Sequence, residues 1–466
     1  MSIIIPANSA VGGGFAVDNS CRFNDGSSDY LTKTFGSAGN RKTWTWSGWV
    51  KRSTLGAQQD LLGTSSGSSA YHLWYIDSDD GVTHNYNGTY VSSSAKFRDI
   101  SAWYHFVCAV DTTQSTAANR VKMYVNGSQI TSFAAAGYPS QDADLTINNS
   151  VRHDISNGGA HFSNNFYLDG YMAEVCFIDG TALDPTSFGE FGEDSGIWKP
   201  IDVSGLTFGN NGFYLDFENS GALGADVSGN SNNFTVNNLT VIDQSTDTCT
   251  NNFATLNPLY SSSGTGFSEG NLNYTQSASA WRSALSTIAS NQGKWYMEVK
   301  KVSGTYAWFG VCGEKIAETV SGSWMGNNNG SSGTNIGYGA QSGNVESNGT
   351  NLFNSSGMAD GTIVGIALDL DNDYIYYSKN GSFINSGNPT SGSSGTGGFA
   401  LPNKVALENY FFGFSSYAGS VVATNFGSPP YAISSGNTDA DGYGNFEYAV
   451  PSGYYSLNTK NLAEYG

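Results

Sequence analysis

The stretch "DLDNDYIYYSKNGSFI", residues Asp369–Ile384, decides how the second half of the chain folds. Its Asn380-Gly381 pair is the strongest short signal for a two-residue type I′ hairpin, because both central residues of that turn adopt positive φ. The Asp and Asn side chains upstream favour a second turn, since they bond their own backbone. The predicted cross-strand pairs are Lys379 with Ser382, Ser378 with Phe383 and Tyr377 with Ile384.

An alternative interpretation of the same stretch is a calcium loop, because Asp369, Asp371 and Asp373 stand at every second position. A loop of the EF-hand type needs glycine at its sixth position and a bidentate Glu at its twelfth. Tyr374 and Asn380 occupy those two positions. The sequence therefore favours a turn between two antiparallel strands over a metal site.

Composition supports an all-β protein with many turns. Glycine accounts for 59 of 466 residues, aromatic residues for 14% and charged residues for only 13%. Aromatic residues suit pleated sheets, whereas disordered chains are rich in charge and poor in aromatic residues. The length allows about three domains, or two large β domains.

Charge and cysteine usage exclude several classes of protein. The formal net charge is −19, so the chain would repel a nucleic-acid backbone, and no nucleic-acid partner is expected. The cysteines lie far apart without a C-x-x-C pair, which predicts free thiols and cytoplasmic synthesis rather than a zinc site. No stretch has the length of a signal peptide's apolar core or of a membrane span, so no membrane insertion is expected. The five cysteines are Cys21, Cys108, Cys176, Cys249 and Cys312.

The first half contains a succession of strand-like segments. "TWTWSGWV" (43–50) alternates tryptophan with other residues, "WYHFVCAVD" (103–111) is apolar on both faces, and "VKMYVNGSQI" (121–130) contains an Asn-Gly hairpin signal. With "FNDGSSDYL" before them and "DGYMAEVCFIDGTALDP" after them, these segments resemble the successive strands of a laminin-G-like, concanavalin A-like jelly roll. The resemblance covers about residues 15–195.

The second half begins a new series with "QGKWYMEVK" (292–300). "AWFGVCG", "NIGYGA", "DGTIVGIALDLDNDYIYYSKNGSFI", "ALPNKVAL" and "VVATNFG" follow in that order. The succession resembles a SPRY domain over about residues 250–430. Two departures are Asp360-Gly361 ahead of the strand, where the family has Gly-Asp, and a Gly-Ser-rich insertion (386–398).

These patterns predict two tandem antiparallel β-sandwiches, a concanavalin A-like jelly roll and a SPRY-like sandwich. We expect an N-terminal arm (1–14), the jelly roll (15–198), a short β-connector (199–249), the SPRY-like domain (250–430) and a docked C-terminal tail (431–466). Helix signals are confined to "ALDPTSFGEF" and "NTKNLAEY", which allow a turn or two each.

Catalytic signals are incomplete. Glucanases of the jelly-roll fold use E-x-D-x-E on one strand, which points three carboxylates the same way. In "YLDFE", Asp216 and Glu218 match, but Tyr214 replaces the nucleophile, so we expect no enzyme and no catalytic residue. No cofactor is predicted, although a loop calcium at "DSDDG" (77–81) is an alternative to a solvated turn. None of the histidines has metal-ligand spacing; they are His72, His84, His105, His153 and His161.

Ligand binding remains the open function class. Exposed aromatic rings stack on sugar faces, and SPRY-like modules bind partners through loops at one end. Trp324 and Tyr338 fall in the loop-rich part of the second half and are the candidate ligand-binding residues, with core packing as the alternative for both.

By analogy, two recognition modules in an acidic Gly-, Ser- and Asn-rich chain without a signal peptide resemble virion proteins of tailed bacteriophages. The hypothesis is a tail fibre, tail-associated or capsid-surface protein, made in the host cytoplasm and located in the virion. Its expected partners are other virion proteins and a host surface glycan, and we expect a homo-oligomer. The alternatives are a polysaccharide-degrading enzyme and a structural subunit without a host ligand.

Overall fold

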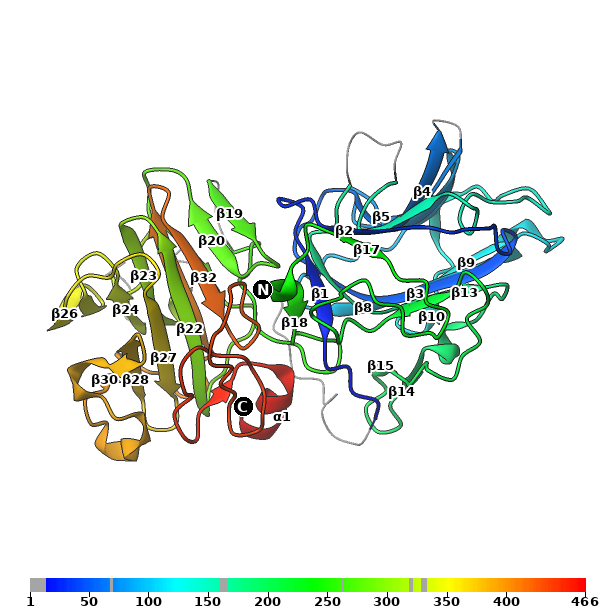
Figure 1. The fold of residues 1–466 in the computed structure, drawn as a ribbon. Helices are drawn as coiled ribbons and strands as arrows, with labels where there is room; N and C mark the ends of the chain where they lie inside the picture. Colours follow the sequence, from blue (N-terminus) through cyan, green and yellow to red (C-terminus); the bar gives the residue numbers. More distant parts are fainter. Residues whose placement is uncertain (1–13, 68–69, 160–165, 261–263, 318–321, 328–332) are drawn as a thin grey trace. The chain divides into compact units, whose positions relative to one another are not determined.

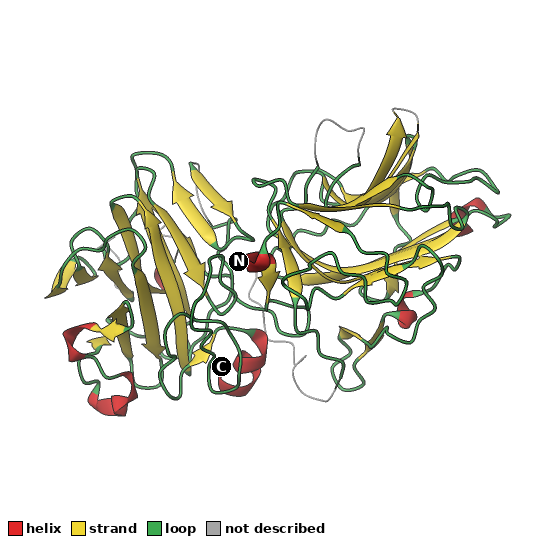
Figure 2. Ribbon diagram, in the orientation of Figure 1, coloured by secondary structure: helices red, strands yellow, loops and turns green. Residues whose placement is uncertain are grey.

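The computed structural model describes residues 14–67, 70–159, 166–260, 264–317, 322–327 and 333–466. The predicted N-terminal arm, apart from residue 14, lies outside these residues, as does His161. The fold is nearly all-β, which confirms the predicted class (Figure 2). Contacts divide the chain into two compact units, Val11–Thr250 and Asn251–Gly466. Among the described residues no helix has the length and hydrophobicity required to cross a bilayer.

The first unit is a sandwich of two antiparallel sheets (Figure 1). One sheet has the order β10-β9-β8-β3-β13-β1-β18, with β16 also paired to β13. Its strands are β1 (Ser20–Phe23), β3 (Thr43–Arg52), β8 (Trp103–Asp111), β9 (Val121–Val125), β10 (Ser128–Gln129), β13 (Gly170–Asp179), β16 (Phe213–Leu215) and β18 (Gln244–Ser245).

The other sheet of the first unit has the order β11-β7-β6-β5-β4-β12-β2-β17. Its strands are β2 (Tyr30–Thr34), β4 (Gln59–Gly67), β5 (Ala70–Ile76), β6 (Val82–Tyr86), β7 (Thr89–Ser93), β11 (Phe133–Ala136), β12 (Arg152–Ile155) and β17 (Thr235–Asn237). A separate pair, β14 (Gly189–Phe191) with β15 (Trp198–Pro200), and three 3-10 turns, η1 (Ala117–Asn119), η2 (Pro185–Ser187) and η3 (Val241–Asp243), complete the unit.

Strand β3 shows why the first sheet needs two apolar faces. Trp44 and Trp46 point into the core between the sheets, and both are fully buried. Trp49 points the other way and packs with Trp103 and Trp198 in a second apolar cluster. Alternate side chains of β3 therefore pack into two different apolar clusters. The apolar sequence of the neighbouring strand β8 likewise predicts burial of both of its faces.

Residues 199–249, predicted as a connector, contribute β16, β17 and β18 to the two sheets of the first unit. A buried ion pair fixes the end of this segment, with Lys51 Nζ 2.6 Å from Asp247 Oδ2 and both side chains 1% exposed. The Trp103 indole N–H also donates to Asp247 Oδ1 (3.1 Å). The segment therefore packs as part of the first sandwich.

The second unit is also a two-sheet sandwich. The larger sheet has the order β19-β20-β32-β22-β27-β28-β29, with β30 paired to β28 and β33 to β22. Its strands are β19 (Thr265–Ser268), β20 (Asn273–Gln276), β22 (Lys294–Ser303), β27 (Ile363–Asp369), β28 (Tyr374–Lys379), β29 (Ser382–Phe383), β30 (Phe399–Ala400), β32 (Val421–Asn425) and β33 (Tyr455–Ser456).

The smaller sheet of the second unit has the order β21-β31-β23-β24-β25-β26. Its strands are β21 (Arg282–Leu285), β23 (Tyr306–Gly313), β24 (Asn335–Gly339), β25 (Asn344–Ser347), β26 (Thr350–Asn354) and β31 (Tyr410–Tyr417). The remaining elements are 3-10 turns η4 (Glu314–Ile316), η6 (Ile384–Ser386) and η7 (Pro389–Ser394), and helix α1 (Thr459–Tyr465).

The acidic triad forms the turn between β27 and β28, as predicted. Asp369 Oδ1 accepts the backbone N–H groups of Asp371 (3.1 Å) and Asn372 (3.0 Å), and its other oxygen pairs with Lys294 Nζ (2.9 Å). Asp373 pairs with Lys404. The carboxylates thus have separate partners within the protein.

The Asn-Gly hairpin is also confirmed, with Asn380 at φ 47° and Gly381 at φ 78°. Lys379 pairs with Ser382 and Ser378 with Phe383. The third predicted pair, Tyr377 with Ile384, is wrong. Strand β29 ends at Phe383, and Ile384 begins the 3-10 turn η6, which leads the chain away from β28.

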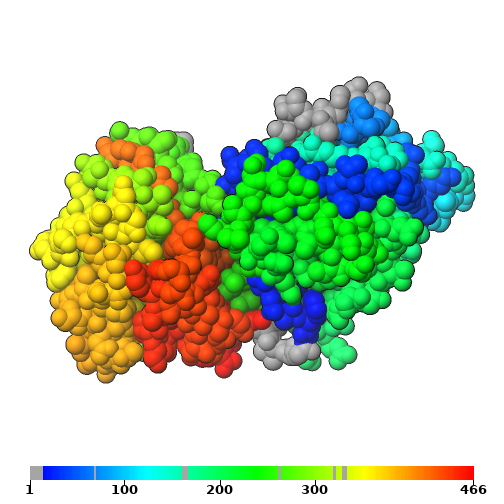
Figure 3. Space-filling model, in the orientation of Figure 1, coloured from blue at the N-terminus to red at the C-terminus, as the bar shows by residue number. Residues whose placement is uncertain are grey.

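The C-terminal tail is anchored by a buried carboxylate of β22. Glu298 is fully buried, and it accepts the backbone N–H groups of Glu447 (2.9 Å) and Tyr448 (2.8 Å). Beyond this point β33 pairs in parallel with β22, and Asn458 caps helix α1. In the space-filling view the red tail residues lie against the second unit rather than projecting from it (Figure 3). The tail is therefore part of the second sandwich's surface.

Replacement of Gly381 by alanine should destabilise the second unit more than replacement of Gly361. Both glycines have positive φ, which costs alanine about 1 kcal/mol. A Cβ on Gly361 meets nothing within 4 Å, whereas one on Gly381 would lie 2.5 Å from the Tyr448 ring. We expect Gly381→Ala to lose at least twice the unfolding free energy lost by Gly361→Ala in urea titrations. Equal losses would contradict the contact with Tyr448.

Removing the tail anchor should release the tail. Glu298→Gln replaces one acceptor oxygen by an NH₂ group and leaves buried N–H donors unpaired, so we expect a loss of about 3 kcal/mol in unfolding free energy. Limited proteolysis should then cut within residues 431–458. Glu447→Gln, whose side chain bonds Ser434 at the surface, is the matched control and should remain resistant. Resistance in both variants would refute the anchor.

Candidate ligand-binding site

Trp324 belongs to a short segment that crosses the outer face of the smaller sheet in the second unit. Two strand glycines allow this close approach. A Cβ on Gly337 would lie 2.4 Å from the Met325 carbonyl oxygen, and one on Gly413 would lie 2.4 Å from Met325 Sδ. The Met325 N–H donates to Ser415 Oγ (2.9 Å), which fixes the segment on β31. The position of Trp324 is therefore set by the sheet beneath it.

Four half-buried aromatic side chains gather beside this segment, and we call them the aromatic patch: Trp281, Tyr306, Trp324 and Tyr417. The Trp281 ring is the centre, with its centroid 5.4 Å from that of Trp324 and 5.4 Å from that of Tyr417. Tyr306 lies 5.5 Å from Tyr417, centroid to centroid. The ring centroid of buried Trp308 lies 6.3 Å from that of Trp324, so the half-buried rings pack on an apolar base.

Strand register brings these rings together. Tyr306 of β23 pairs directly with Tyr417 of β31. On the other side of β31, Arg282 of β21 pairs with Ser416, which places Trp281 next to Tyr417. The sequence analysis named only Trp324 from this group. The other three residues are separated by up to 136 positions, and only the order β21-β31-β23 brings them side by side.

One carboxylate adjoins the patch. Glu346 of β25 is half-buried and accepts the Trp324 indole N–H on Oε2 (3.3 Å). No ion pair within the described ranges involves Glu346. Aromatic rings beside a carboxylate can contact both the C–H faces and the hydroxyl groups of a sugar.

Tyr338, the second residue predicted for ligand binding, lies elsewhere. It is on β24, its exposed fraction is 0%, and its ring packs 5.4 Å from that of Tyr377 within the core. Alternation along β24 points Tyr338 inward, whereas Gly337 and Gly339 face outward. The ring has no face open to a ligand in this structure, in agreement with the core-packing alternative.

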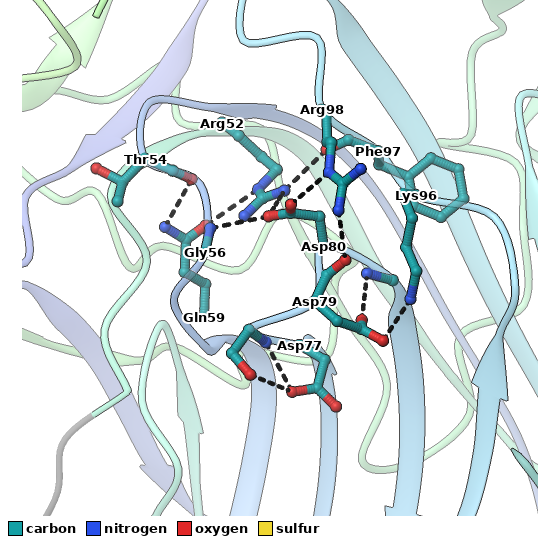
Figure 4. Close-up of polar contacts among 12 residues, drawn as sticks. Arg52, Thr54, Gly56, Gln59, Asp77, Asp79, Asp80, Lys96, Phe97 and Arg98 are labelled. Carbon is teal, nitrogen blue, oxygen red and sulfur yellow. Dashed lines mark hydrogen bonds and ion pairs between the residues drawn. The ribbon is translucent and has the colours of Figure 1, made fainter. Parts of the chain in front are cut away.

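The acidic turn Asp77–Gly81 joins β5 to β6 in the first unit and is surrounded by cations (Figure 4). Arg52 Nη1 lies 3.0 Å and Arg98 Nε 2.7 Å from the Asp80 carboxylate. Burial opposes ionisation of Asp80, but hydrogen bonds from Arg98, the Gly56 N–H and Arg52 outweigh it and lower the pKa. Asp79 pairs with Lys96, which lowers its pKa as well. The carboxylates of Asp79 and Asp80 are therefore already paired with protein cations.

Within the described ranges no group of three or more His, Cys, Asp or Glu side chains is placed to hold a metal ion. His105 is a satisfied sheet residue: it accepts the Trp198 indole N–H on Nδ1 (3.0 Å), and its Nε2 lies 2.8 Å from Ser47 Oγ. The Nε2 atoms of His72 and His84 lie 2.7 Å apart in the core, a contact that the spacing of the two residues in the sequence does not predict. All five cysteines are free thiols, as predicted.

The catalytic candidates are not arranged on one strand. Strand β16 ends at Leu215, Phe217 adopts φ 59°, and Asp216 accepts the Glu218 N–H in a turn (3.1 Å). Tyr214 donates its hydroxyl to Glu174 Oε2 (2.6 Å). Glu174 sits in a bulge of β13 with φ 52°, and burial raises its pKa to about 7. The sequence analysis missed this residue because "MAEVCFI" looks like an ordinary apolar strand.

Family comparisons agree with this architecture. A profile described as Concanavalin A-like lectin/glucanases superfamily (Laminin_G_3) matches residues 25–186, and the SPRY domain profile matches residues 294–428. The chain carries a laminin G-like domain followed by a SPRY domain. The description of the first profile names both lectins and glucanases. No curated protein sequence matches the chain.

Solved structures similar to parts of the chain include the SPRY domain of human HERC1, with 16% identity, a TM-score of 0.29, and coverage of 36% of this chain and 96% of that one. A putative carbohydrate binding protein from Bacteroides ovatus has 15% identity and a TM-score of 0.29, with 48% of this chain and 59% of that chain covered. A heptameric SAP-like pentraxin from Limulus polyphemus has 14% identity and a TM-score of 0.25, with 33% and 71% covered. Three rings of the aromatic patch lie within the residues matched by the SPRY profile and Trp281 lies just ahead of them, whereas the acidic turn and Glu174 lie within the residues matched by the laminin G-like profile.

Glu174 should make the stability of the laminin G-like domain depend on pH. Its folded pKa of about 7 exceeds its ordinary value of 4.5, so between these values the folded state binds more protons than the unfolded state. The contribution of Glu174 to the unfolding free energy should therefore fall as pH rises through this window, by up to about 3 kcal/mol, whereas the buried histidines, whose pKa values are lowered by burial, contribute in the opposite direction. Urea titrations at pH 4.5 to 8 should show the Glu174 contribution as a difference in pH dependence between the unmodified protein and Glu174→Gln, and no such difference for Glu193→Gln, a variant of an exposed glutamate. Identical slopes in all three proteins would contradict it.

Proposed function

We propose that the chain is a non-enzymatic virion protein of a tailed bacteriophage that binds a host surface glycan. In this proposal it is a tail fibre, tail-associated or capsid-surface protein, made in the host cytoplasm and assembled into particles. The aromatic patch of the SPRY domain binds the glycan. Other faces of the two sandwiches contact neighbouring virion proteins, and the chain forms a homo-oligomer.

The observation that carries glycan binding is the aromatic patch. Large aromatic side chains in a β domain are mostly buried, yet these four share one partly exposed surface. A carboxylate beside them supplies a hydrogen-bond acceptor for hydroxyl groups. The virion setting is supported by the pairing of two recognition modules in an acidic chain rich in Gly, Ser and Asn.

Binding without hydrolysis is the expected result with host cells. The purified full chain should sediment with bacterial cells and with their extracted surface polysaccharide, and chromatography should detect no released oligosaccharides. Released oligosaccharides would favour the polysaccharide-degrading alternative. Retention by neither cells nor polysaccharide would favour a structural subunit. Absence of the chain from purified particles by mass spectrometry would refute the virion setting.

A further inference from the structure

We infer that the aromatic patch of the SPRY domain, with Glu346 at its edge, binds an uncharged oligosaccharide segment and discriminates against acidic glycans. This inference rests on the proposed glycan binding and names the ligand class for the same site. It follows from the charges around the patch, the geometry of its rings and the bonding of Glu346.

The charges around the patch disfavour an acidic ligand. The four patch residues contribute no cation, and the charged group bonded to a patch side chain is the Glu346 carboxylate. Arg282 follows Trp281 in the chain, but strand alternation puts it on the opposite face of β21, the face of core residue Ala284. Its Nη1 donates to the Trp281 carbonyl (2.8 Å). A carboxylated or sulfated sugar on the patch would therefore meet the Glu346 carboxylate, which forms no ion pair among the described residues, in a chain whose net charge is −19.

The aromatic rings of the patch are inclined to one another. Trp281 and Trp324 are inclined by 49°, and Trp281 and Tyr417 by 42°. Since neighbouring rings differ in inclination, a single flat sugar cannot stack on all of them. Successive sugar units can each contact a different ring, which favours an oligosaccharide segment over a monosaccharide.

Glu346 has two roles at the edge of the patch. Its Oε2 atom orients the Trp324 indole, and its Oε1 atom has no hydrogen-bond partner among the described residues. A half-buried carboxylate oxygen with spare acceptor capacity suits a sugar hydroxyl, which is a donor. Glu346 is thus a positioning residue for Trp324 and a hydroxyl acceptor for the ligand.

The test uses pairs of neutral and acidic polymers, of which dextran and dextran sulfate share a backbone. The full chain is measured against dextran and dextran sulfate, and against neutral galactomannan and acidic alginate, by biolayer interferometry at low salt. The variants are Trp281→Ala, Trp324→Ala and Glu346→Gln, with Tyr90→Ala as control, because Tyr90 is an exposed aromatic of the laminin G-like domain (41%). Thermal melting shows whether each variant folds, and the milder Trp324→Phe replaces an alanine variant that does not.

We expect at least one neutral polymer to bind, and its acidic counterpart to bind at least tenfold more weakly. Trp281→Ala and Trp324→Ala should each weaken neutral binding at least tenfold, while Tyr90→Ala leaves it within twofold. Glu346→Gln keeps an acceptor oxygen and loses the charge, so the difference between dextran and dextran sulfate should shrink.

Other outcomes separate the two proposals. Binding of acidic polymers alone, lost in the tryptophan variants, would overturn the uncharged ligand class. Neutral binding that survives both tryptophan variants would overturn the assignment to this patch and leave glycan binding by the chain intact. If none of the four polymers nor host polysaccharide binds, the inference and the proposed glycan binding both fail.

Discussion

Both sandwiches depend on a central strand whose two faces are buried by different partners. In the laminin G-like domain this strand is β3, paired with β8 and β13. In the SPRY domain it is β22, paired with β27 and β32. Trp295, Met297 and Val299 of β22 face the core, and the alternate residues Tyr296 and Glu298 face the tail. A one-residue shift of register would exchange these two sets, so the hydrophobic core and the tail anchor fix the register together.

The same constraint explains the aromatic patch. A strand that fills the core with one set of side chains must present the other set outside, and in the smaller SPRY sheet that outer set includes several aromatic residues and glycines. The glycines admit residues 322–327 onto the sheet, and the aromatic rings pack around Trp324. The partly exposed rings are thus held in fixed positions by β21, β23 and β31, and a pre-organised surface loses little conformational entropy when a ligand binds.

Local signals in the sequence were enough to predict much of the fold. Asn380-Gly381 and Asn126-Gly127 need positive φ at both residues, and both form hairpins. The alternation along β22 predicts a strand with two different faces, and the apolar run of β8 predicts a strand that is buried on both faces. These predictions succeed because backbone geometry and period-2 alternation act between neighbours in the chain.

The candidate site could be predicted only in part, because its contacts join distant segments. Trp324 is recognisable as an aromatic in a loop-rich region, but Trp281 joins it through the strand order of the folded sheet. Tyr338, like Trp324, is an aromatic residue in a loop-rich part of the sequence. Only the structure shows which alternate residues of β24 face the core, and Tyr338 is one of them. Glu174 could not be predicted from the sequence for a similar reason. A bulge turns it toward Tyr214, and no local pattern marks the bulge.

An acidic chain offers many apparent cation sites, and hydrogen bonding decides among them. The tail sequence from Asn437 to Gly442 has the N-x-D-x-D-G pattern of a calcium loop. Yet Asp439 accepts the N–H groups of Asp441 and Tyr443 on one oxygen and the N–H group of Ser456 on the other. Asp369 and Asp80 are likewise occupied by backbone N–H groups and cations.

A carboxylate that already accepts several N–H groups stabilises a turn through those hydrogen bonds. A ligand would have to displace them in order to bind. Glu346 differs, because it accepts one indole N–H and keeps an oxygen without a partner among the described residues. The contrast between Asp439 and Glu346 does not follow from the number of acidic residues in either segment. It follows from how many donors each carboxylate already serves, and this is why the aromatic patch, rather than any acidic turn, is the place to look for a ligand.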